Sequence, residues 1–209
     1  MNKEMRDLPS PQGLYDPSYE HDACGIGIVA NIKGKKSYGI IDDALTILEN
    51  LRHRGAEGAD ANSGDGAGIL VQIPHQFFKR ECEVLGFSLP DEGEYGVGMI
   101  FAHRYETFRK KQMEAFEDIV RSEGLSILGW RDVPVDESLI GNIAKQTCPH
   151  FLQVFIRKDP TMKTQMDFER KLYVIRKLAE KAIVPESQKN GTDFYIASLS
   201  SKISSTRAC

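Results

Sequence analysis

The residue in this sequence best suited to nucleophilic chemistry is Cys24, which stands at an abrupt change in composition. Residues 1–23 are polar and punctuated by proline, whereas Cys24-Gly-Ile-Gly-Ile-Val-Ala-Asn31 is a short apolar run. A thiolate is a strong nucleophile, but a free thiol has a pKa of about 8.5 and needs a base beside it. A cysteine before a strand is also a common buried packing residue. Its position alone therefore leaves both roles open.

Two further segments carry residue types that occur at binding sites. Arg54 lies in Leu51-Arg-His-Arg-Gly-Ala56, where its guanidinium offers forked donors for a carboxylate. A cation in the last turn of a helix is also stabilised by the helix dipole, which is the simpler role. Gly64-Asp-Gly-Ala-Gly68 precedes a strand and lacks Gly-Lys-Ser/Thr, so it is neither a dinucleotide fingerprint nor a P-loop. A tight turn before a strand is the plainer interpretation.

The remaining candidates are interpreted as structural. Cys148 and His150 could suggest a Cys–His pair, but Pro149 between them disfavours a regular strand. The four cysteines show no metal-ligand spacing, so no metal site is predicted and the thiols indicate a reducing cytoplasm. Isolated residues expected to be structural or exposed are His75, His103 and Cys82, and Trp130 is expected in the core.

Composition excludes several classes of protein. The chain has 209 residues, 41% of them hydrophobic and 27% charged, and a net charge of -3. These values indicate a soluble globular protein with no nucleic-acid or membrane surface. No window approaches the roughly 18 apolar residues of a membrane span, and the start lacks the apolar region of a secretory signal. We expect a cytoplasmic location.

Strand and helix patterns alternate along the chain. The expected strands are 24–31, 67–73, 94–102, 125–133, 151–157 and 193–199. The expected helices are one between Ser37 and Gly55, then 74–85, 105–122, 136–146 and 164–183. The small, polar segment 200–209 is expected to form no further element. This alternation predicts one continuous domain with layers of both kinds, and it is compatible with a parallel or an antiparallel sheet.

Several of these segments together carry a family resemblance. The stretch around Cys24 from Asp16 to Gly27, the His-Arg-Gly at Arg54, the Gly-Asp-Gly-Ala-Gly stretch and the segment 194–201 resemble the class II glutamine amidotransferase domain of glutamate synthase large subunits. In that family a short leader is removed and the cysteine becomes the first residue. The resemblance implies a leader at 1–23 and a partial amidotransferase domain at 24–209. It also implies an α+β N-terminal-nucleophile hydrolase fold, a four-layer αββα sandwich with two antiparallel sheets, incomplete at the C-terminus.

The resemblance also implies a mechanism. An α-amine freed at Cys24 has a pKa of about 7.7–8.0, so one residue supplies both nucleophile and base. Arg54 lines the site, and Gly25 and Gly27 allow close backbone approach to glutamine. Glutamine would yield glutamate and ammonia, and the ammonia would aminate 2-oxoglutarate elsewhere. FMN and an iron–sulfur cluster are implied in the full-length relative and no cofactor in this chain. The implied partners are the remaining glutamate synthase domains and a small subunit.

Two alternatives follow from where the resemblance ends. It ends at about residue 201, whereas the family's oxyanion-hole Asn-Gly pair and its glutamine-binding aspartate lie beyond residue 209. We therefore expect a truncated chain with weak or no glutaminase activity by itself. A non-catalytic remnant or interaction module of the same fold is one alternative. Another class II amidotransferase is the second, although the leader and the Gly-Asp-Gly-Ala-Gly stretch disfavour it.

Overall fold

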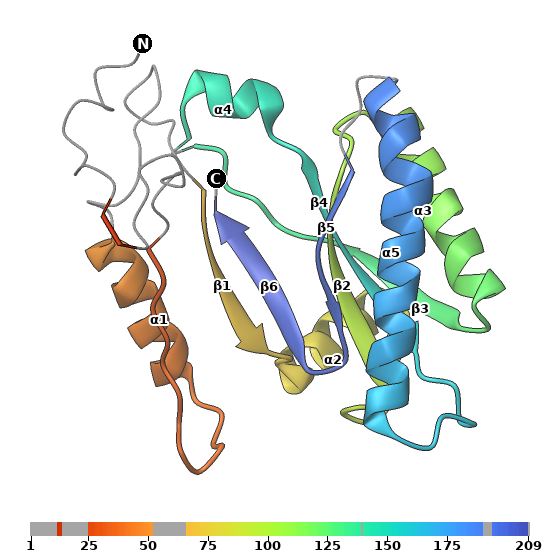
Figure 1. Cartoon of the computed structure of the whole chain (residues 1–209), viewed down its shortest axis with the longest axis horizontal. Coiled ribbons are helices and arrows are strands. Elements are labelled where there is room, and N and C mark those ends of the chain that lie inside the picture. Colours follow the sequence, from red (N-terminus) through yellow and green to blue (C-terminus); the bar gives the residue numbers. More distant parts are fainter. Residues whose placement is uncertain (1–11, 14–24, 52–65, 139, 190–193, 209) are drawn as a thin grey trace. The chain divides into compact units, whose positions relative to one another are not determined.

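The computed structural model describes residues 12–13, 25–51, 66–138, 140–189 and 194–208. The chain forms two compact units, residues 1–56 and 57–209, whose elements are labelled in Figure 1. Because Cys24 and most of the preceding segment lie outside the described residues, the predicted division between leader and domain at residues 23 and 24 remains a prediction.

Helix α1 (Tyr38–Asn50) is the regular element of the first unit. Its half-covered side chains recur at three- and four-residue spacings, which confirms the predicted apolar face except for Leu45, which is exposed. These half-buried residues are Ile40, Ile41, Ala44, Ile47, Leu48 and Leu51. Ser37 occupies the predicted N-cap position, but its side chain makes no capping hydrogen bond.

The predicted strand at 24–31 is wrong over its described part. Residues 25–30 have no regular structure, and the side chains of Ile26 and Ile28 are 83% and 85% exposed. A strand needs a partner for its backbone hydrogen bonds, and the described residues of the first unit include no other strand. The turn predicted at 31–34 is confirmed, because the Gly34 N–H donates to the Asn31 carbonyl at 2.9 Å.

A four-stranded antiparallel sheet forms the centre of the second unit. Its strand order is β3-β4-β2-β5, with β2 at Tyr95–Ala102, β3 at Ser126–Asp132, β4 at His150–Arg157 and β5 at Tyr195–Ser200. All three neighbouring pairs are antiparallel, so the parallel alternative is excluded. The predicted strands in this sheet are confirmed to within one or two residues at each end.

A second antiparallel sheet consists of β1 (Ala67–Gln72) and β6 (Ile203–Ala208). The prediction that residues 200–209 form no element is therefore wrong. Side-chain pattern cannot reveal this strand, because its stability comes from backbone pairing with a segment far away in sequence. The Glu169 carboxylate holds the turn before β6, accepting from the Ser201 N–H at 2.6 Å and from the Ser200 hydroxyl at 3.0 Å.

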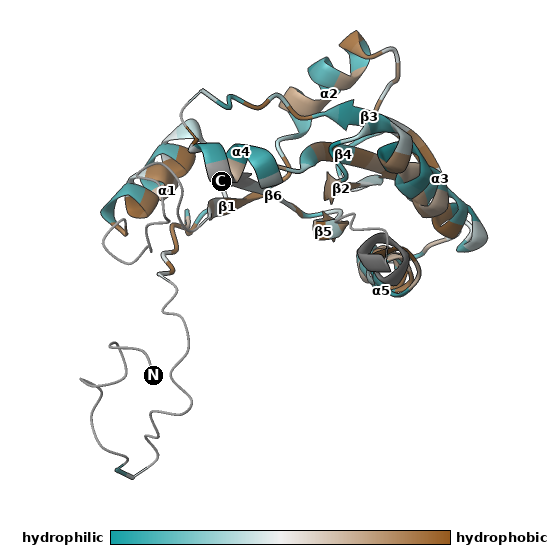
Figure 2. Cartoon of the chain, turned by 90° about the horizontal axis from the view of Figure 1, so that it is seen from above, coloured by the Kyte–Doolittle hydropathy of each residue, from teal (hydrophilic) through white to brown (hydrophobic). Residues whose placement is uncertain are grey.

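Helices α3 (Glu106–Ser122) and α5 (Gln165–Lys189) cover one side of the four-stranded sheet. Figure 2 shows them on that side and the β1–β6 pair on the other. Gly96 of β2 permits the close packing, since a methyl group there would lie 2.6 Å from Leu172 Cδ1 of α5. α5 was predicted to end at residue 183 and instead continues to Lys189.

The two short helices lie elsewhere in the second unit. α2 (His75–Val84) begins after Pro74, as predicted, and buries Phe78 and Cys82 against the other sheet face. α4 (Asn142–Thr147) is shorter than the predicted 136–146. Asp136 explains the difference, because its carboxylate accepts a hydrogen bond from the Ser138 N–H at 2.9 Å. This local bond competes with helix formation.

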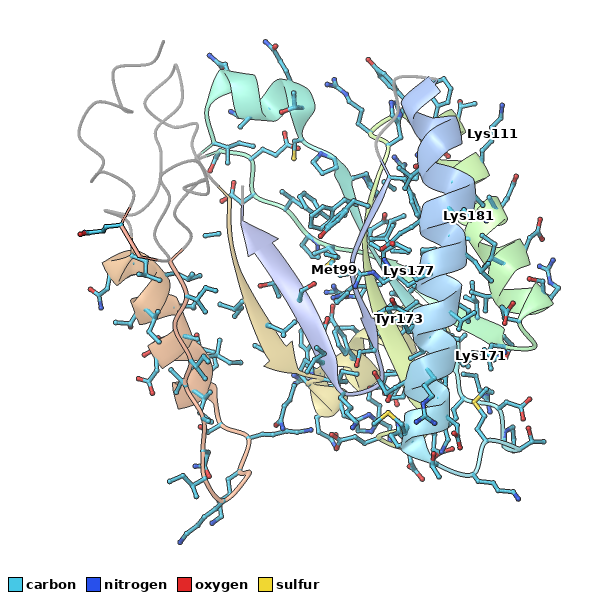
Figure 3. All side chains as sticks on the ribbon, viewed as in Figure 1. Met99, Lys111, Lys171, Tyr173, Lys177 and Lys181 are labelled. Atoms are coloured by element: carbon cyan, nitrogen blue, oxygen red, sulfur yellow. The ribbon has the colours of Figure 1, made fainter. Side chains whose placement is uncertain are left out.

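The outer surfaces of α3 and α5 are solvated and charged. Lys110 pairs with Glu106 at 2.7 Å, and both side chains are exposed. On α5, Tyr173, Lys177 and Lys181 follow one another at intervals of four residues (Figure 3). The Lys177 ammonium lies 5.8 Å from the Tyr173 ring centroid. These are surface contacts of small energetic effect.

Candidate active site

Both predicted site residues, Cys24 and Arg54, lie outside the described residues. The structure does describe the chain beside each of them. Gly25 follows Cys24 directly, and Leu51 at the end of α1 precedes Arg54 by three positions. The geometry of these flanking residues therefore bears on the site.

The flanking segments contact each other. A methyl group placed on Gly25 would lie 2.9 Å from Leu51 Cδ2, and one placed on Gly27 would overlap the side chain of Ile47. A larger residue at Gly27 would therefore force Ile47 or the segment to move, whereas at Gly25 the end of the Leu51 side chain would have to shift. The chain next to Cys24 lies against the helix end from which Arg54 follows. The predicted approach of these glycines to a substrate is untested.

Cys82, Cys148 and His150, which all lie among the described residues, behave as structural residues. Cys82 is fully buried, and burial raises the pKa of its thiol to about 12, so it stays protonated at neutral pH. Cys148 Sγ donates to the Pro149 carbonyl, whereas His150 Nε2 bonds the Asp132 carboxylate. Their partners differ, which supports the interpretation that they form no catalytic pair.

His75 and Trp130 also have structural partners. His75 Nδ1 lies 3.0 Å from the Tyr95 hydroxyl, a group whose pKa is raised by burial. Trp130 packs against the core and its ring N–H donates to Glu117 at 2.8 Å. The predicted core position of Trp130 is confirmed in part, because its side chain is half-buried.

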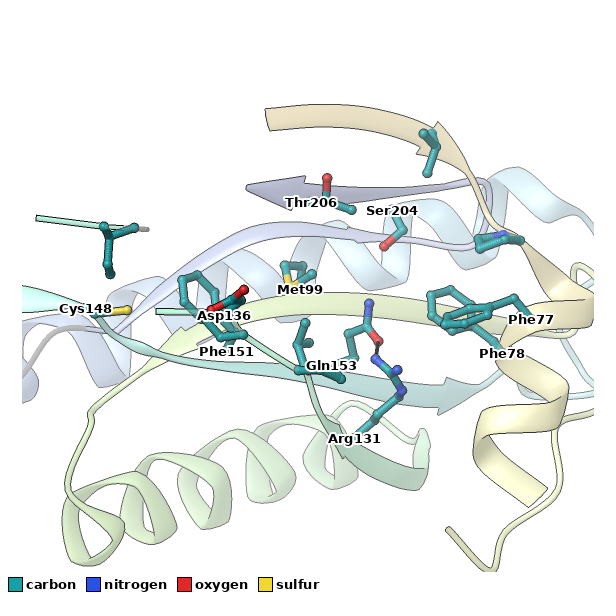
Figure 4. A pocket seen from close by; sticks show the side chains of 16 residues that line it. Phe77, Phe78, Met99, Arg131, Asp136, Cys148, Phe151, Gln153, Ser204 and Thr206 are labelled. Carbon is teal, nitrogen blue, oxygen red and sulfur yellow. Dashed lines mark hydrogen bonds between the residues drawn. The ribbon is translucent and has the colours of Figure 1, made fainter. Parts of the chain in front are cut away.

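A cavity of about 540 Å³ lies between the two sheets of the second unit. Its walls are mostly apolar, but Arg131 of β3, Gln153 of β4 and Ser204 of β6 face it (Figure 4). Sequence reasoning missed all three. Arg131 and Gln153 carry a usable signal, because each interrupts an apolar strand at an inward-facing position. Ser204 belongs to the strand that was not predicted.

Comparison with known proteins places the chain. The family described as glutamine amidotransferases class-II matches residues 24–206. The chain belongs to this family. The family match ends at residue 206, within β6. The expectation that the resemblance ends at about residue 201 is therefore corrected. Its α+β fold with two antiparallel sheets agrees with the N-terminal-nucleophile hydrolase architecture.

Similar curated proteins are glutamate synthases. The chain is 49% identical over 195 residues to the glutamate synthase [NADPH] large chain of Bacillus subtilis. The aligned region covers 93% of this chain and 12% of the relative. It is 43% identical over 202 residues to the glutamate synthase [NADH] of Saccharomyces cerevisiae, an alignment that covers 92% of this chain and 9% of the relative. It is 41% identical over 194 residues to the ferredoxin-dependent glutamate synthase 2 of Arabidopsis thaliana, an alignment that covers 93% of this chain and 12% of the relative. The amidotransferase chain thus spans about one-eighth or less of these relatives.

The described residues contain neither a cluster suited to a metal ion nor a helix suited to a membrane. In the part of the chain that the structure describes, no three His, Cys, Asp or Glu side chains gather so that they could hold a metal ion. Within the same residues, no helix combines the length and the apolar character needed to cross a membrane.

Proposed function

We propose that this chain carries a glutaminase site whose nucleophile is Cys24, freed as an N-terminal residue by removal of residues 1–23. The family match carries the proposal, because it begins at residue 24 and leaves out the polar leader. A family boundary at a cysteine is what an N-terminal nucleophile predicts. While the peptide bond from Ala23 is intact, the nitrogen of Cys24 is an amide and cannot accept a proton.

The proposed reaction has two steps. The Cys24 sulfur attacks the side-chain amide carbon of glutamine, and the α-amine of Cys24 takes the thiol proton and passes it to the leaving ammonia. A γ-glutamyl thioester remains. Water then attacks the thioester carbon, which releases glutamate and restores the thiol. In the first step one residue therefore supplies both the nucleophile and the base.

Arg54 is proposed to bind the substrate. A guanidinium can hold the α-carboxylate of glutamine with two parallel hydrogen bonds. The contact between Gly25 and Leu51 supports this role, because it draws the chain beside Cys24 toward the segment that leads to Arg54. We assign no oxyanion-hole residue.

The function of the longer protein is a wider proposal. The relatives are named glutamate synthases, and we propose that ammonia from this site serves glutamate synthesis in such a protein. The family resemblance of the sequence implies 2-oxoglutarate as the acceptor, with FMN and an iron–sulfur cluster in the remaining domains. A cytoplasmic location and a small subunit as partner belong to the same proposal.

Intact-mass measurement of the expressed 209-residue chain tests the site. We expect loss of residues 1–23 and one adduct with an electrophilic glutamine analogue, located at Cys24 by peptide mapping. Cys24→Ala should abolish the adduct, whereas Cys148→Ser should retain it. An unprocessed chain that captures no analogue would instead support a non-catalytic remnant or interaction module.

A test of Arg54 as the substrate-binding residue compares the glutamine analogue with a reagent that has no group for Arg54 to bind. Arg54→Met should slow capture of the glutamine analogue by about 10-fold or more, because a hydrogen-bonded charge pair contributes about 1.5–3 kcal/mol. Alkylation of Cys24 by iodoacetamide, which has no α-carboxylate, should keep its rate. Equal slowing of both reagents would show that Arg54 supports the structure instead.

A further inference from the structure

The inter-sheet cavity of the second unit has the size and lining of a small-molecule site. Its volume of about 540 Å³ falls in the range of roughly 300–1,000 Å³ typical of ligand pockets. Strands β2 and β4 form its floor and β1 and β6 its roof. Its lining residues run from Val71 to Thr206, whereas Cys24 and Arg54 lie outside the described residues.

The positive charge of Arg131, on the cavity floor, is paired with the carboxylate of Glu81. The Arg131 side chain is 8% exposed, and its Nη2 lies 2.6 Å from Glu81 Oε2. Its Nη1 donates to Gln153 Oε1 at 3.1 Å. A ligand carboxylate would have to compete with Glu81 for this guanidinium, so the cavity favours an uncharged ligand.

The bond to Arg131 also orients Gln153. Because the amide oxygen accepts from the guanidinium, the amide nitrogen is turned the other way. Figure 4 shows that nitrogen directed toward β6, on the side where Ser204 lies. The cavity therefore holds a donor whose direction is set before any ligand arrives.

Ser204 supplies the second polar group. It is 2% exposed, and its hydroxyl has no hydrogen-bond partner in the part of the chain that the structure describes. A buried hydroxyl without a partner is unfavourable, because folding has removed it from water without replacing the bond. The hydroxyl points from β6 into the cavity, toward Gln153 (Figure 4).

The other walls are mostly apolar, and Asp136 and Thr206 line the cavity at exposed positions. Met99 and Phe151 lie on the floor, and Phe77, Val71 and Val133 lie around it. A ligand body that contacts these side chains gains from leaving water. Among the buried lining residues, Gln153 and Ser204 are the ones that offer a polar group to a ligand, because Arg131 is paired with Glu81.

We propose that this cavity binds a small uncharged molecule with an aromatic or aliphatic body and one carbonyl oxygen. The oxygen would accept hydrogen bonds from the Gln153 amide and from the Ser204 hydroxyl, which would satisfy the buried group. The apolar body would occupy the space between the sheets.

Titration of the 209-residue chain with three matched probes tests this inference. Acetophenone has the ring and the carbonyl, toluene lacks the oxygen, and benzoate adds a charge. Affinity is measured from amide chemical shifts of β4, β6 and the Gln153 side chain. We expect acetophenone to bind about three- to tenfold more tightly than toluene, and benzoate to bind more weakly than acetophenone.

Neighbouring serines provide the control. Ser204→Ala should reduce acetophenone affinity to that of toluene. Ser205→Ala should change neither, because its hydroxyl bonds Ser198 at 2.8 Å. Cys24→Ala should also bind acetophenone normally, which separates this site from the glutaminase proposal. Three results would overturn the inference: equal affinity for toluene and acetophenone, strongest binding of benzoate, or no chemical-shift change at the cavity. The last would show that water alone fills the space.

Discussion

The two faces of the four-stranded sheet are built in different ways. Toward α3 and α5, the strands present aliphatic side chains that are fully covered, including Ile100, Val154 and Ile196. On the opposite face, α2 covers one end, and the rest opens into a cavity where Arg131 and Gln153 interrupt the apolar surface. Both faces belong to the same strands, since side chains alternate along each one.

The difference shows how one sheet separates stability from recognition. The helix-covered face contributes burial of apolar area, which is the largest favourable term in folding. The cavity face keeps polar groups that would be costly on the first face. Mutations on the two faces should therefore have effects of different kind and size.

The largest effect is expected on the helix-covered face. Phe168 of α5 is fully buried there, so Phe168→Ala should lower the free energy of unfolding by about 3–5 kcal/mol. Urea denaturation measures the loss. Tyr173→Ala on the exposed side of the same helix should cost about 0.5 kcal/mol or less. Similar losses in both variants would contradict the assignment of the buried face.

The second-largest loss of stability is expected when the Glu81–Arg131 ion pair on the cavity face is broken. Glu81→Gln leaves the buried Arg131 guanidinium without its 2.6 Å partner and should cost about 1.5–3 kcal/mol in urea denaturation. Adding Arg131→Met should recover part of that loss, because an apolar side chain needs no ion partner. Glu106→Gln, at the exposed pair with Lys110, is the control and should leave stability unchanged. An equal effect of both single changes would show that burial of Arg131 contributes nothing.

Alkaline pH should weaken the part of the cavity face that α2 covers. Burial raises the pKa of Cys82 from an ordinary 9.0 to about 12. Above pH 9 the unfolded thiol loses its proton while the folded one keeps it, so this contribution is complete below pH 9 and is lost as pH rises toward 12. The free energy of unfolding should fall by up to about 1.4 kcal/mol per pH unit.

Cys82→Ala is the matched variant for that measurement. Denaturation at pH 7, 9 and 10 should show a shallower decline than in the parent chain, although the variant starts from lower stability. Tyr95 is retained in both proteins; its pKa is raised first by burial and then by Cys82, so its own contribution to the decline should be somewhat smaller in the variant. Parallel declines in the two proteins would exclude Cys82 as the cause.

The smallest effect is expected at Ser204. Its hydroxyl has no partner among the described residues, so Ser204→Ala should change the free energy of unfolding by less than about 0.5 kcal/mol or increase it slightly. Ser205→Ala removes a bonded hydroxyl and should cost about 1 kcal/mol. A larger loss at Ser204 than at Ser205 would show that the cavity hydroxyl is bonded in solution.

Much of the second unit was predictable because its patterns are local. The strand at 95–102 and the helix at 106–122 begin and end within a residue or so of their predicted limits, since hydrophobic periodicity and proline and glycine positions act over a few residues. The strand at 203–208 was missed and the one at 25–30 was wrong for one reason. Strand formation depends on a partner, and no local pattern shows whether a partner is present.

The sequence by itself determined the family and the candidate chemistry, because Cys24, Arg54 and the glycine-rich stretch are recognisable by type and spacing. The family resemblance also implied two antiparallel sheets, but only the tertiary structure decided which strands pair and that β6 pairs with β1. It alone also revealed the cavity at Arg131, Gln153 and Ser204. The physical reason is that backbone pairing and burial join residues far apart in the chain, so neither can be read from neighbouring residues.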